Sequence, residues 1–242
     1  MMSKNNNQET VRRFSKPVIV AHWLNAFAFF ALLLTALPMY TDFFNWLYPV
    51  FGGPANARLL HRIFAIMFIL PTIFMILVDP KSFFHWIKQI ISWKKHDFQF
   101  FAPFAKDFIG KHADVPKQDF YNAGEKLNSI VQILTTIMLI GSGIVMWGPD
   151  NFPKGLVLWA YPIHNIGVGL AATLVVGHIY LSIGHPKSKA SLRGMIKGDV
   201  SLEYAKEHHG RWYDELIQQE VVQGKKGKKS KAPSNSGKNL GV

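Results

Sequence analysis

Four long apolar runs alternate with polar, basic segments along this chain of 242 residues. The runs cover residues 18–37, 59–78, 127–147 and 157–183, and each is long enough for a helix that crosses the hydrocarbon core of a bilayer. Pro71 inside the second run is expected to kink its helix, which membrane helices tolerate. The pattern predicts an all-α integral membrane protein built on a bundle of four transmembrane helices.

The segments between and beyond these runs predict smaller elements. Residues 1–17 form a polar N-terminal segment that leads into an uncleaved first span. The basic segment 79–126 carries apolar residues at helical spacing, which predicts a short helix in the membrane interface: Phe83, Phe84, Trp86, Ile87, Ile90 and Ile91. Residues 184–222 predict a cytoplasmic helical extension, and the Lys-, Gly- and Ser-rich residues 223–242 predict a disordered tail.

Composition agrees with this organisation. The chain is 49% hydrophobic yet has a formal net charge of +12, because its charges avoid the apolar runs. No nucleic-acid-binding motif accompanies the charge, so we expect no nucleic-acid partner and contact of the basic residues with membrane lipid. Lysine and arginine crowd the N-terminal flank, the central segment and the tail, whereas the other two connections contain only Arg58 and Lys154. The positive-inside rule therefore predicts that both termini are cytoplasmic.

The absence of cysteine restricts the cofactors that the chain can hold. With no cysteine in the sequence, disulfides, thiolate zinc sites, cysteine-ligated iron–sulfur clusters and covalently attached c-type haem are excluded. Any haem bound to this chain is therefore held without a covalent link to the protein.

Four histidines, His22, His61, His164 and His178, lie inside the predicted spans. A separation of 14 residues places His164 and His178 within roughly 40° of one face of the fourth helix and about 21 Å apart along it. Topology then pairs His22 with His178 near the cytoplasmic surface, and His61 with His164 near the outer surface. Two bis-histidine b haems, and hence electron transfer, are the favoured interpretation.

Two alternatives to haem ligation remain open for these histidines. Each imidazole can simply hydrogen-bond to a neighbouring helix, and zinc or copper is less favoured because such sites usually gather more than two protein ligands. The other histidines lie in polar segments, where we expect them to be solvated or to face a partner: His85, His96, His112, His185, His208 and His209.

An ordered set of motifs extends this interpretation. They are R-F at 13–14, A-H-W at 21–23, R-L-L-H at 58–61, Y-N-A-G-E-K at 121–126, I-H at 163–164, and S-L-R-G-M-I-K-G-D-V-S…A-K-E-H-H-G-R-W-Y at 191–213. Over residues 12–217 the chain resembles the gamma, cytochrome b556 subunit of respiratory formate dehydrogenase. The resemblance implies the same histidine pairing and a bacterial inner-membrane location.

The resemblance also implies a menaquinone or ubiquinone site beside the inner haem, formed by Asn122, Ala123 and Gly124. Glu125 replaces the glutamine that is usual in the family, a departure that alters proton delivery or pairs with Lys126. From the sequence alone, Asn122 is also a good N-cap for the third span.

We therefore expect a membrane-anchoring di-haem cytochrome b that passes electrons from an iron–sulfur (beta) subunit to quinone on the cytoplasmic side. A molybdenum or tungsten catalytic (alpha) subunit would supply those electrons, since this chain has no dehydrogenase motif of its own. The alternatives are the cytochrome b subunit of a nickel–iron hydrogenase and, from another class, a haem-free membrane anchor or transporter. The chain shows no internal repeat of the kind that transporters carry.

Overall fold

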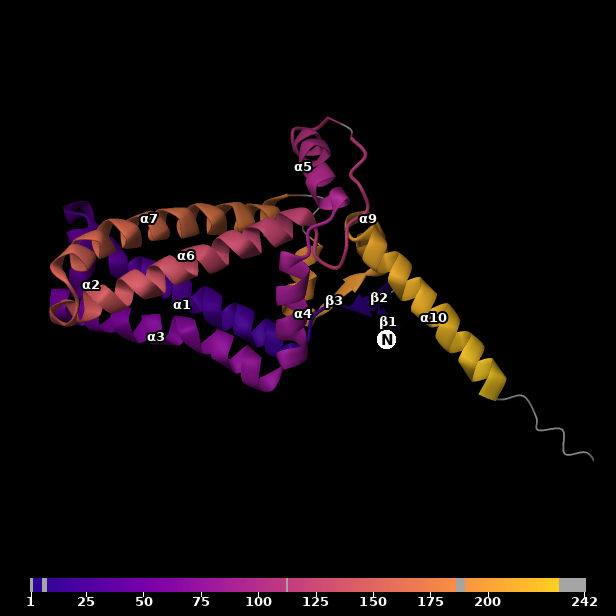
Figure 1. Cartoon of the computed structure of the whole chain (residues 1–242), viewed down its shortest axis with the longest axis horizontal. Helices are drawn as coiled ribbons and strands as arrows, with labels where there is room; N and C mark the ends of the chain where they lie inside the picture. Colours follow the sequence, from indigo (N-terminus) through magenta and orange to yellow (C-terminus); the bar gives the residue numbers. More distant parts are fainter. Residues whose placement is uncertain (1, 6–7, 112, 186–189, 231–242) are drawn as a thin grey trace, which may run out of the picture.

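The computed structural model describes residues 2–5, 8–111, 113–185 and 190–230 (Figure 1). Its body is formed by four long helices: α1 (Lys16–Tyr40), α3 (Pro54–Val78), α6 (Ala123–Trp147) and α7 (Lys154–Ile179), which continues as a short π-helix, η3 (Tyr180–Gly184). Each has the length and apolar composition of a membrane-spanning helix. The predicted four-helix bundle is confirmed, and each helix extends a few residues past its apolar run to reach its cap.

Local sequence explains where these helices begin. Ser15 caps α1, accepting a hydrogen bond from the backbone N–H of Val18 at 3.5 Å, and Pro17 favours the first turn. The Ser15 hydroxyl also donates to Asp79, the N-cap of α4 (Pro80–Ile91). This contact joins the start of α1 to the end of α3.

The bundle consists of two helical hairpins. Helix α1 packs along α3 and helix α6 packs along α7, whereas close backbone contacts between the two pairs are few among the described residues. The first hairpin turns through η1 (Asp42–Leu47) and α2 (Tyr48–Phe51), and the second through η2 (Pro149–Asn151). We call this the turn end of the bundle; the extension end is the opposite one, where α4 lies (Figure 1).

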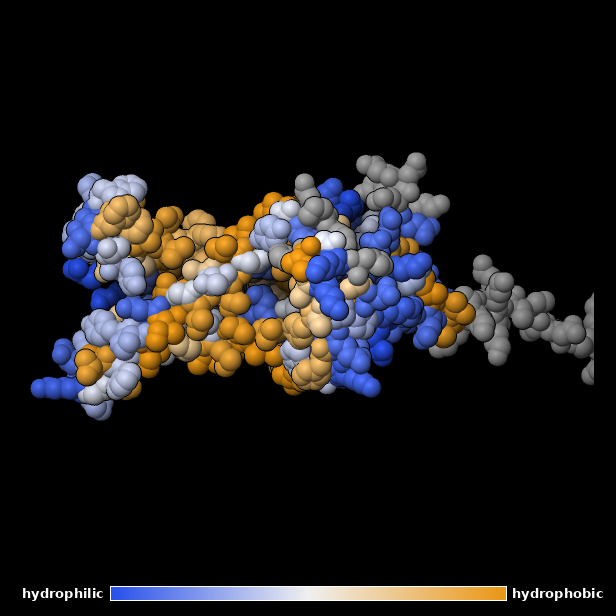
Figure 2. Space-filling view, turned by 90° about the horizontal axis from the view of Figure 1, so that it is seen from above, coloured by the Kyte–Doolittle hydropathy of each residue, from blue (hydrophilic) through white to orange (hydrophobic). Residues whose placement is uncertain are grey.

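The outer surface of the bundle is apolar. Large side chains on the long helices are widely exposed, with Leu77 at 75%, Leu158 at 73% and Val176 at 68%. Figure 2 shows hydrophobic residues as a band between hydrophilic residues at the two ends. A surface of this kind is stable only in contact with lipid or with other apolar helices.

The central segment folds at the extension end. The predicted interfacial helix is α4, and the Trp86 indole N–H donates to the Ser129 hydroxyl at 3.3 Å, which holds α4 against α6. A second helix, α5 (Lys95–Phe108), was not expected from the sequence. It begins where the Asp97 carboxylate accepts a hydrogen bond from the backbone N–H of Lys94 at 2.8 Å.

The C-terminal extension is helical but also contains a strand, which the all-α expectation did not include. Its elements are α8 (Ser191–Lys197), β3 (Asp199–Ser201), α9 (Leu202–His208) and α10 (Gly210–Ser230). Strand β3 pairs antiparallel with β2 (Gln8–Arg12), which pairs with β1 (Met2–Asn5), so the N-terminal segment and the C-terminal extension share one small sheet.

A small apolar core fixes this sheet to the extension. Val11 of β2 lies opposite Val200 of β3, and both are buried together with Tyr204, Ala205 and Trp212. Helix α10 continues to Ser230, so part of the segment expected to be disordered is helical. Residues 231–242 lie outside the described residues.

Candidate functional site

Two pairs of histidines face each other across the bundle. The ring centroids of His22 on α1 and His178 on α7 are 6.2 Å apart, with an interplanar angle of 64°. Those of His61 on α3 and His164 on α7 are 6.5 Å apart, at 63°. The structure thus brings together the pairs that depth in the membrane predicted, and α7 contributes one member to each.

Each pair joins the two hairpins. His22 and His61 belong to the α1–α3 hairpin, and His164 and His178 belong to the α6–α7 hairpin. Two imidazoles that share one metal, each with a nitrogen about 2 Å from it and a centroid about 1 Å further back, are separated by roughly 6 Å between centroids. Both pairs match this separation, so the residues fit a haem iron with two axial imidazoles.

Hydroxyl groups contact both histidines of the pair near the turn end. The Thr35 hydroxyl oxygen lies 3.0 Å from Nδ1 of His61, within the α1–α3 hairpin. The Ser142 hydroxyl oxygen lies 2.9 Å from Nδ1 of His164, within the α6–α7 hairpin. In both cases Nδ1 is the nitrogen in contact, which leaves Nε2 as the nitrogen available to a metal.

The segment expected to bind quinone forms the start of α6. Asn122 is the N-cap: its Oδ1 accepts from the backbone N–H of Glu125 at 2.9 Å, and the Glu125 carboxylate accepts from the Asn122 N–H at 3.0 Å. Ala123 is fully buried, and its N–H donates to the Gln118 side chain at 3.0 Å. Gly124 lies beside Phe100, whose ring carbon would be 3.6 Å from an added Cβ. The three residues are contiguous, and the capping role of Asn122 is evident.

Glu125 pairs with Arg13 rather than with Lys126. The Arg13 guanidinium donates to Glu125 at 3.0 Å and to the Phe120 carbonyl at 2.8 Å. The Arg13 side chain is 1% exposed, whereas that of Glu125 is 32% exposed. Pairing with Lys126, one of the two alternatives for Glu125, is absent among the described residues, because Arg13 lies where the N-terminal segment crosses the start of α6.

Lys126 is fully buried and takes part in a second ionic cluster. Its ammonium contacts the Asp97 carboxylate at 2.9 Å and Asp119 at 3.5 Å. Asp119 also accepts from Lys94 at 3.1 Å and from Arg211 at 3.0 Å. Burial alone would raise the pKa of the Asp119 carboxyl, but the hydrogen bond from Lys94 and the surrounding positive charges hold that pKa below its usual value.

His96, Asp97 and Asp119 have their ligand atoms close enough together to resemble a metal site. The Lys126 ammonium, however, already supplies the positive charge between the two carboxylates. We therefore interpret the cluster as a structural ion network that joins the central segment to α6 and, through Arg211, to α10.

His209 lies in the interior of the extension end. It is 0% exposed, its Nδ1–H donates to the Asp119 carbonyl at 3.1 Å, and its buried Nε2 has no hydrogen-bond partner among the described residues. Burial lowers the pKa of His209 to about 3, and the positive charge of Arg13 acts in the same direction. The expectation that His209 is solvated or faces a partner is therefore wrong, and His112 lies outside the described residues.

Sequence reasoning missed the buried ionic residues near the base of α6. Arg13, Lys126 and His209 belong to the motifs described above, but nothing in their spacing indicates burial. For Asp119, the only signal is a charge close to the N-cap of an apolar helix, and Asp97 carries no such signal. Their pairing depends on α5, which the hydrophobic pattern did not predict.

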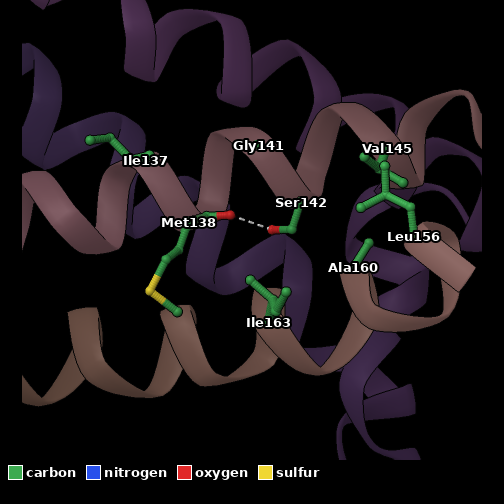
Figure 3. Close-up of a pocket in the computed structure, with 8 residues that line it drawn as sticks. All are labelled: Ile137, Met138, Gly141, Ser142, Val145, Leu156, Ala160 and Ile163. Atoms are coloured by element: carbon green, nitrogen blue, oxygen red, sulfur yellow. Dashed lines mark hydrogen bonds between the residues drawn. The ribbon is translucent and has the colours of Figure 1, made fainter. Parts of the chain in front are cut away.

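One apolar cavity of about 330 Å³ lies between α6 and α7 (Figure 3). It is lined by Ile137, Met138, Gly141, Ser142, Val145, Leu156, Ala160 and Ile163. The Ser142 hydroxyl donates to the Met138 carbonyl, as Figure 3 shows, and it contacts His164 as well. Its polar group is thus already satisfied, so the cavity offers only apolar contact.

Comparison with known proteins agrees with these features. The family model described as prokaryotic cytochrome b561 matches residues 13–198. The formate dehydrogenase cytochrome b556(fdo) subunit of Escherichia coli K12 is 26% identical over 212 residues, covering 86% of this chain and 94% of that protein. The nitrate-inducible cytochrome b556(Fdn) subunit of the same strain is 28% identical over 209 residues, covering 83% and 88%. The formate dehydrogenase cytochrome b556 subunit of Haemophilus influenzae Rd is 26% identical over 221 residues, covering 88% and 86%.

The buried ion pair of Lys126 gives a stability prediction. We expect Lys126→Met to lower the free energy of unfolding by about 3–5 kcal/mol, because it leaves the Asp97 carboxylate buried without its counter-ion. The control is Lys117→Met, which removes an exposed pair with Asp214 and should cost about 0.2–1 kcal/mol. Thermal unfolding in detergent measures both, and equal losses in the two variants would contradict the assignment.

The buried neutral His209 gives a pH prediction. Below an unfolded-state pKa of about 6.5, the unfolded chain binds a proton that the folded chain, with its pKa of about 3 for His209, does not bind. This contribution to stability is therefore present above pH ~6.5 and lost as the pH falls, by about 2 kcal/mol at pH ~5.

Thermal unfolding of the His209→Gln variant between these pH values tests the prediction, since glutamine can still donate to Asp119 but does not titrate. The loss on acidification should shrink in His209→Gln and persist in the control His208→Gln. An unchanged pH dependence in His209→Gln would show that other groups are responsible.

Proposed function

The chain belongs to the prokaryotic cytochrome b561 family, and from this premise we propose that it is the membrane-anchoring di-haem cytochrome b subunit of a respiratory formate dehydrogenase. The observation that carries the proposal is the pair of histidine couples that join the two hairpins, with centroids 6.2 and 6.5 Å apart. The relatives named as formate dehydrogenase cytochrome b556 subunits support the choice of complex.

His22 with His178, and His61 with His164, are the proposed axial ligands of two b haems. When bound, b haem supplies one-electron transfer, and two protein ligands leave no open position for oxygen chemistry. These residues would hold the two groups at different depths, since His164 and His178 are about 21 Å apart along α7 at 1.5 Å per residue. This spacing suits a protein that carries electrons across a membrane.

The proposed location is the bacterial inner membrane, with both termini and the central segment on the cytoplasmic side. The asymmetric distribution of lysine and arginine supports this orientation. It assigns His22 and His178 to the inner haem, and His61 and His164 to the outer haem. Anionic headgroups would then contact the basic residues of the extension end.

Electrons would come from an iron–sulfur (beta) subunit fed by a molybdenum or tungsten catalytic (alpha) subunit. Menaquinone or ubiquinone would accept them near the inner pair, beside Asn122, Ala123 and Gly124. Helix α6 packs along α7, and the start of α6 lies at the same end of the bundle as His178 near the end of α7, which supports this position. The chain alone would have no dehydrogenase activity.

The direct test is a reduced-minus-oxidised absorption spectrum of the purified complex, with pyridine haemochrome quantification. About two b haems per chain are expected. Protein without b haem would overturn the proposal and leave a haem-free membrane anchor, and copurification with a hydrogenase would redirect it to a nickel–iron hydrogenase complex.

Single histidine variants test the ligand assignment. We expect His61→Ala and His164→Ala to remove the same haem, and His22→Ala and His178→Ala to remove the other, because each haem needs both imidazoles. Redox titration of the α-band identifies the component that remains in each variant. Retention of both components in any of the four variants would refute the assignment.

Variants of Asn122 separate its capping role from quinone binding. Asn122→Ser keeps a cap, so stability should stay within a few tenths of a kcal/mol, whereas Asn122→Ala should cost about 1 kcal/mol. Both should slow quinone reduction if the side-chain amide contacts the quinone, with both haems retained. Unchanged quinone kinetics in the two variants would remove Asn122 from the site.

A further inference from the structure

The Thr35 hydroxyl determines which nitrogen of His61 carries its proton. Thr35 is 1% exposed, and its Oγ1 lies 2.8 Å from the Ala31 carbonyl and 3.0 Å from the Leu32 carbonyl. A hydroxyl has one proton to donate, and here these carbonyls of the preceding turn accept it. With that proton directed to a carbonyl, the hydroxyl oxygen accepts a hydrogen bond from the Nδ1–H of His61 at 3.0 Å. His61 is thus held in the Nδ1–H tautomer, with its lone pair on Nε2.

Ser142 does the same for His164 in the other hairpin. Its hydroxyl donates to the Met138 carbonyl and lies 3.3 Å from the Leu139 carbonyl, so its oxygen accepts from the His164 Nδ1–H at 2.9 Å. The two contacts come from different helices, α1 and α6, and from different residue types. They nevertheless produce the same tautomer on the two facing imidazoles.

The inner pair lacks this arrangement. Among the described residues, the rings of His22 and His178 pack against each other, and His22 also packs against Trp23, but neither ring has a hydrogen bond to a hydroxyl. The two pairs therefore differ in their hydrogen bonds to hydroxyl groups, although their ring separations are nearly equal. The hydrogen bonds to Thr35 and Ser142 are made at Nδ1, whereas Nε2 is the nitrogen available to the metal. Such a bond changes the electronic properties of the imidazole as a ligand.

We propose that Thr35 and Ser142 are positioning residues that lock both axial imidazoles of the outer haem and lower its reduction potential. The inference rests on the proposed function, since it requires a haem between His61 and His164. A hydrogen bond donated from the distal ring nitrogen orients the imidazole and raises its basicity. A more basic ligand stabilises the oxidised iron more than the reduced iron, which lowers the potential.

This contribution favours electron transfer from the outer pair to the inner pair. Two hydrogen-bonded imidazoles would lower the potential on the His61–His164 side, and the described residues make no equivalent contact with His22 or His178. Electrons that enter near the turn end of the bundle would therefore move toward the haem at His22 and His178, which would have the higher reduction potential. The direction agrees with delivery to a quinone at the extension end.

Thr135 on α6 shows what a hydroxyl does without a histidine. It is 2% exposed, and its Oγ1 lies 3.0 Å from both the Val131 and Gln132 carbonyls, the same pattern as at Thr35. At this position the hydroxyl contacts only the backbone carbonyls of its own helix. Thr135 is therefore a matched control for the general effect of removing a buried hydroxyl from these helices.

The experiment is a redox titration of the purified complex, followed at the α-band, for Thr35→Val, Ser142→Ala and Thr135→Val. We expect the potential of the component that His61→Ala abolishes to rise in Thr35→Val and in Ser142→Ala. A tenfold change in this one-electron equilibrium corresponds to a shift of about 59 mV. The other component should keep its potential, and Thr135→Val should change neither.

The hydroxyl-retaining variants Thr35→Ser and Ser142→Thr separate the hydrogen bond from packing, and both should keep the original potential. Unchanged potentials in Thr35→Val and Ser142→Ala, or equal shifts in Thr135→Val, would overturn the inference while leaving a di-haem protein. Absence of b haem from the unmodified complex would instead refute the proposed function.

Discussion

An imidazole in the hydrocarbon core of a membrane needs a partner, and the bundle is arranged around that requirement. Close backbone contacts occur within each hairpin, and few occur between the hairpins. The two histidine couples place polar side chains opposite each other between the hairpins, with one couple near each end of the bundle. A helical bundle that was closely packed throughout would leave no room for a flat prosthetic group at these positions.

Ion pairs connect separate segments at the extension end, where the His22–His178 couple lies. Arg13 joins the N-terminal segment to α6 through Glu125, and Lys126 joins α6 to α5 through Asp97. Asp119 adds contacts with Lys94 and with Arg211 of α10. Such buried ion pairs are costly to assemble, but once formed they strongly disfavour separation of the segments that carry them. The start of α6, where we propose that quinone binds, is held within this network.

The two ends of the bundle thus differ in the polar groups that they contain. At the turn end, neutral hydroxyls contact His61 and His164 within each hairpin, and the described residues there form no network of ion pairs. At the extension end, charged groups from distant parts of the chain converge at the end of the bundle that holds His22 and His178. A protein that transfers electrons between these ends, and takes up protons at only one of them, would use this asymmetry.

The hydrophobic pattern by itself determined the four long helices, because crossing a bilayer requires about 20 consecutive apolar residues and a closed set of backbone hydrogen bonds. It also determined which histidines can meet, because alternating helix direction places His22 and His178 at one depth and His61 and His164 at the other. These conclusions need only helix rise and the order of the spans, so they do not depend on packing.

Only the tertiary structure decided which groups surround these residues. The pairing of Glu125 with Arg13, the contact of buried His209 with Asp119 and the pairing of β2 with β3 all join residues more than 80 positions apart. Likewise, the contacts of Thr35 with His61 and Ser142 with His164 depend on the rotation of each helix about its own axis. Local periodicity sets neither the packing angle nor the choice of ionic partner, because both follow from the balance of burial and charge in the folded chain.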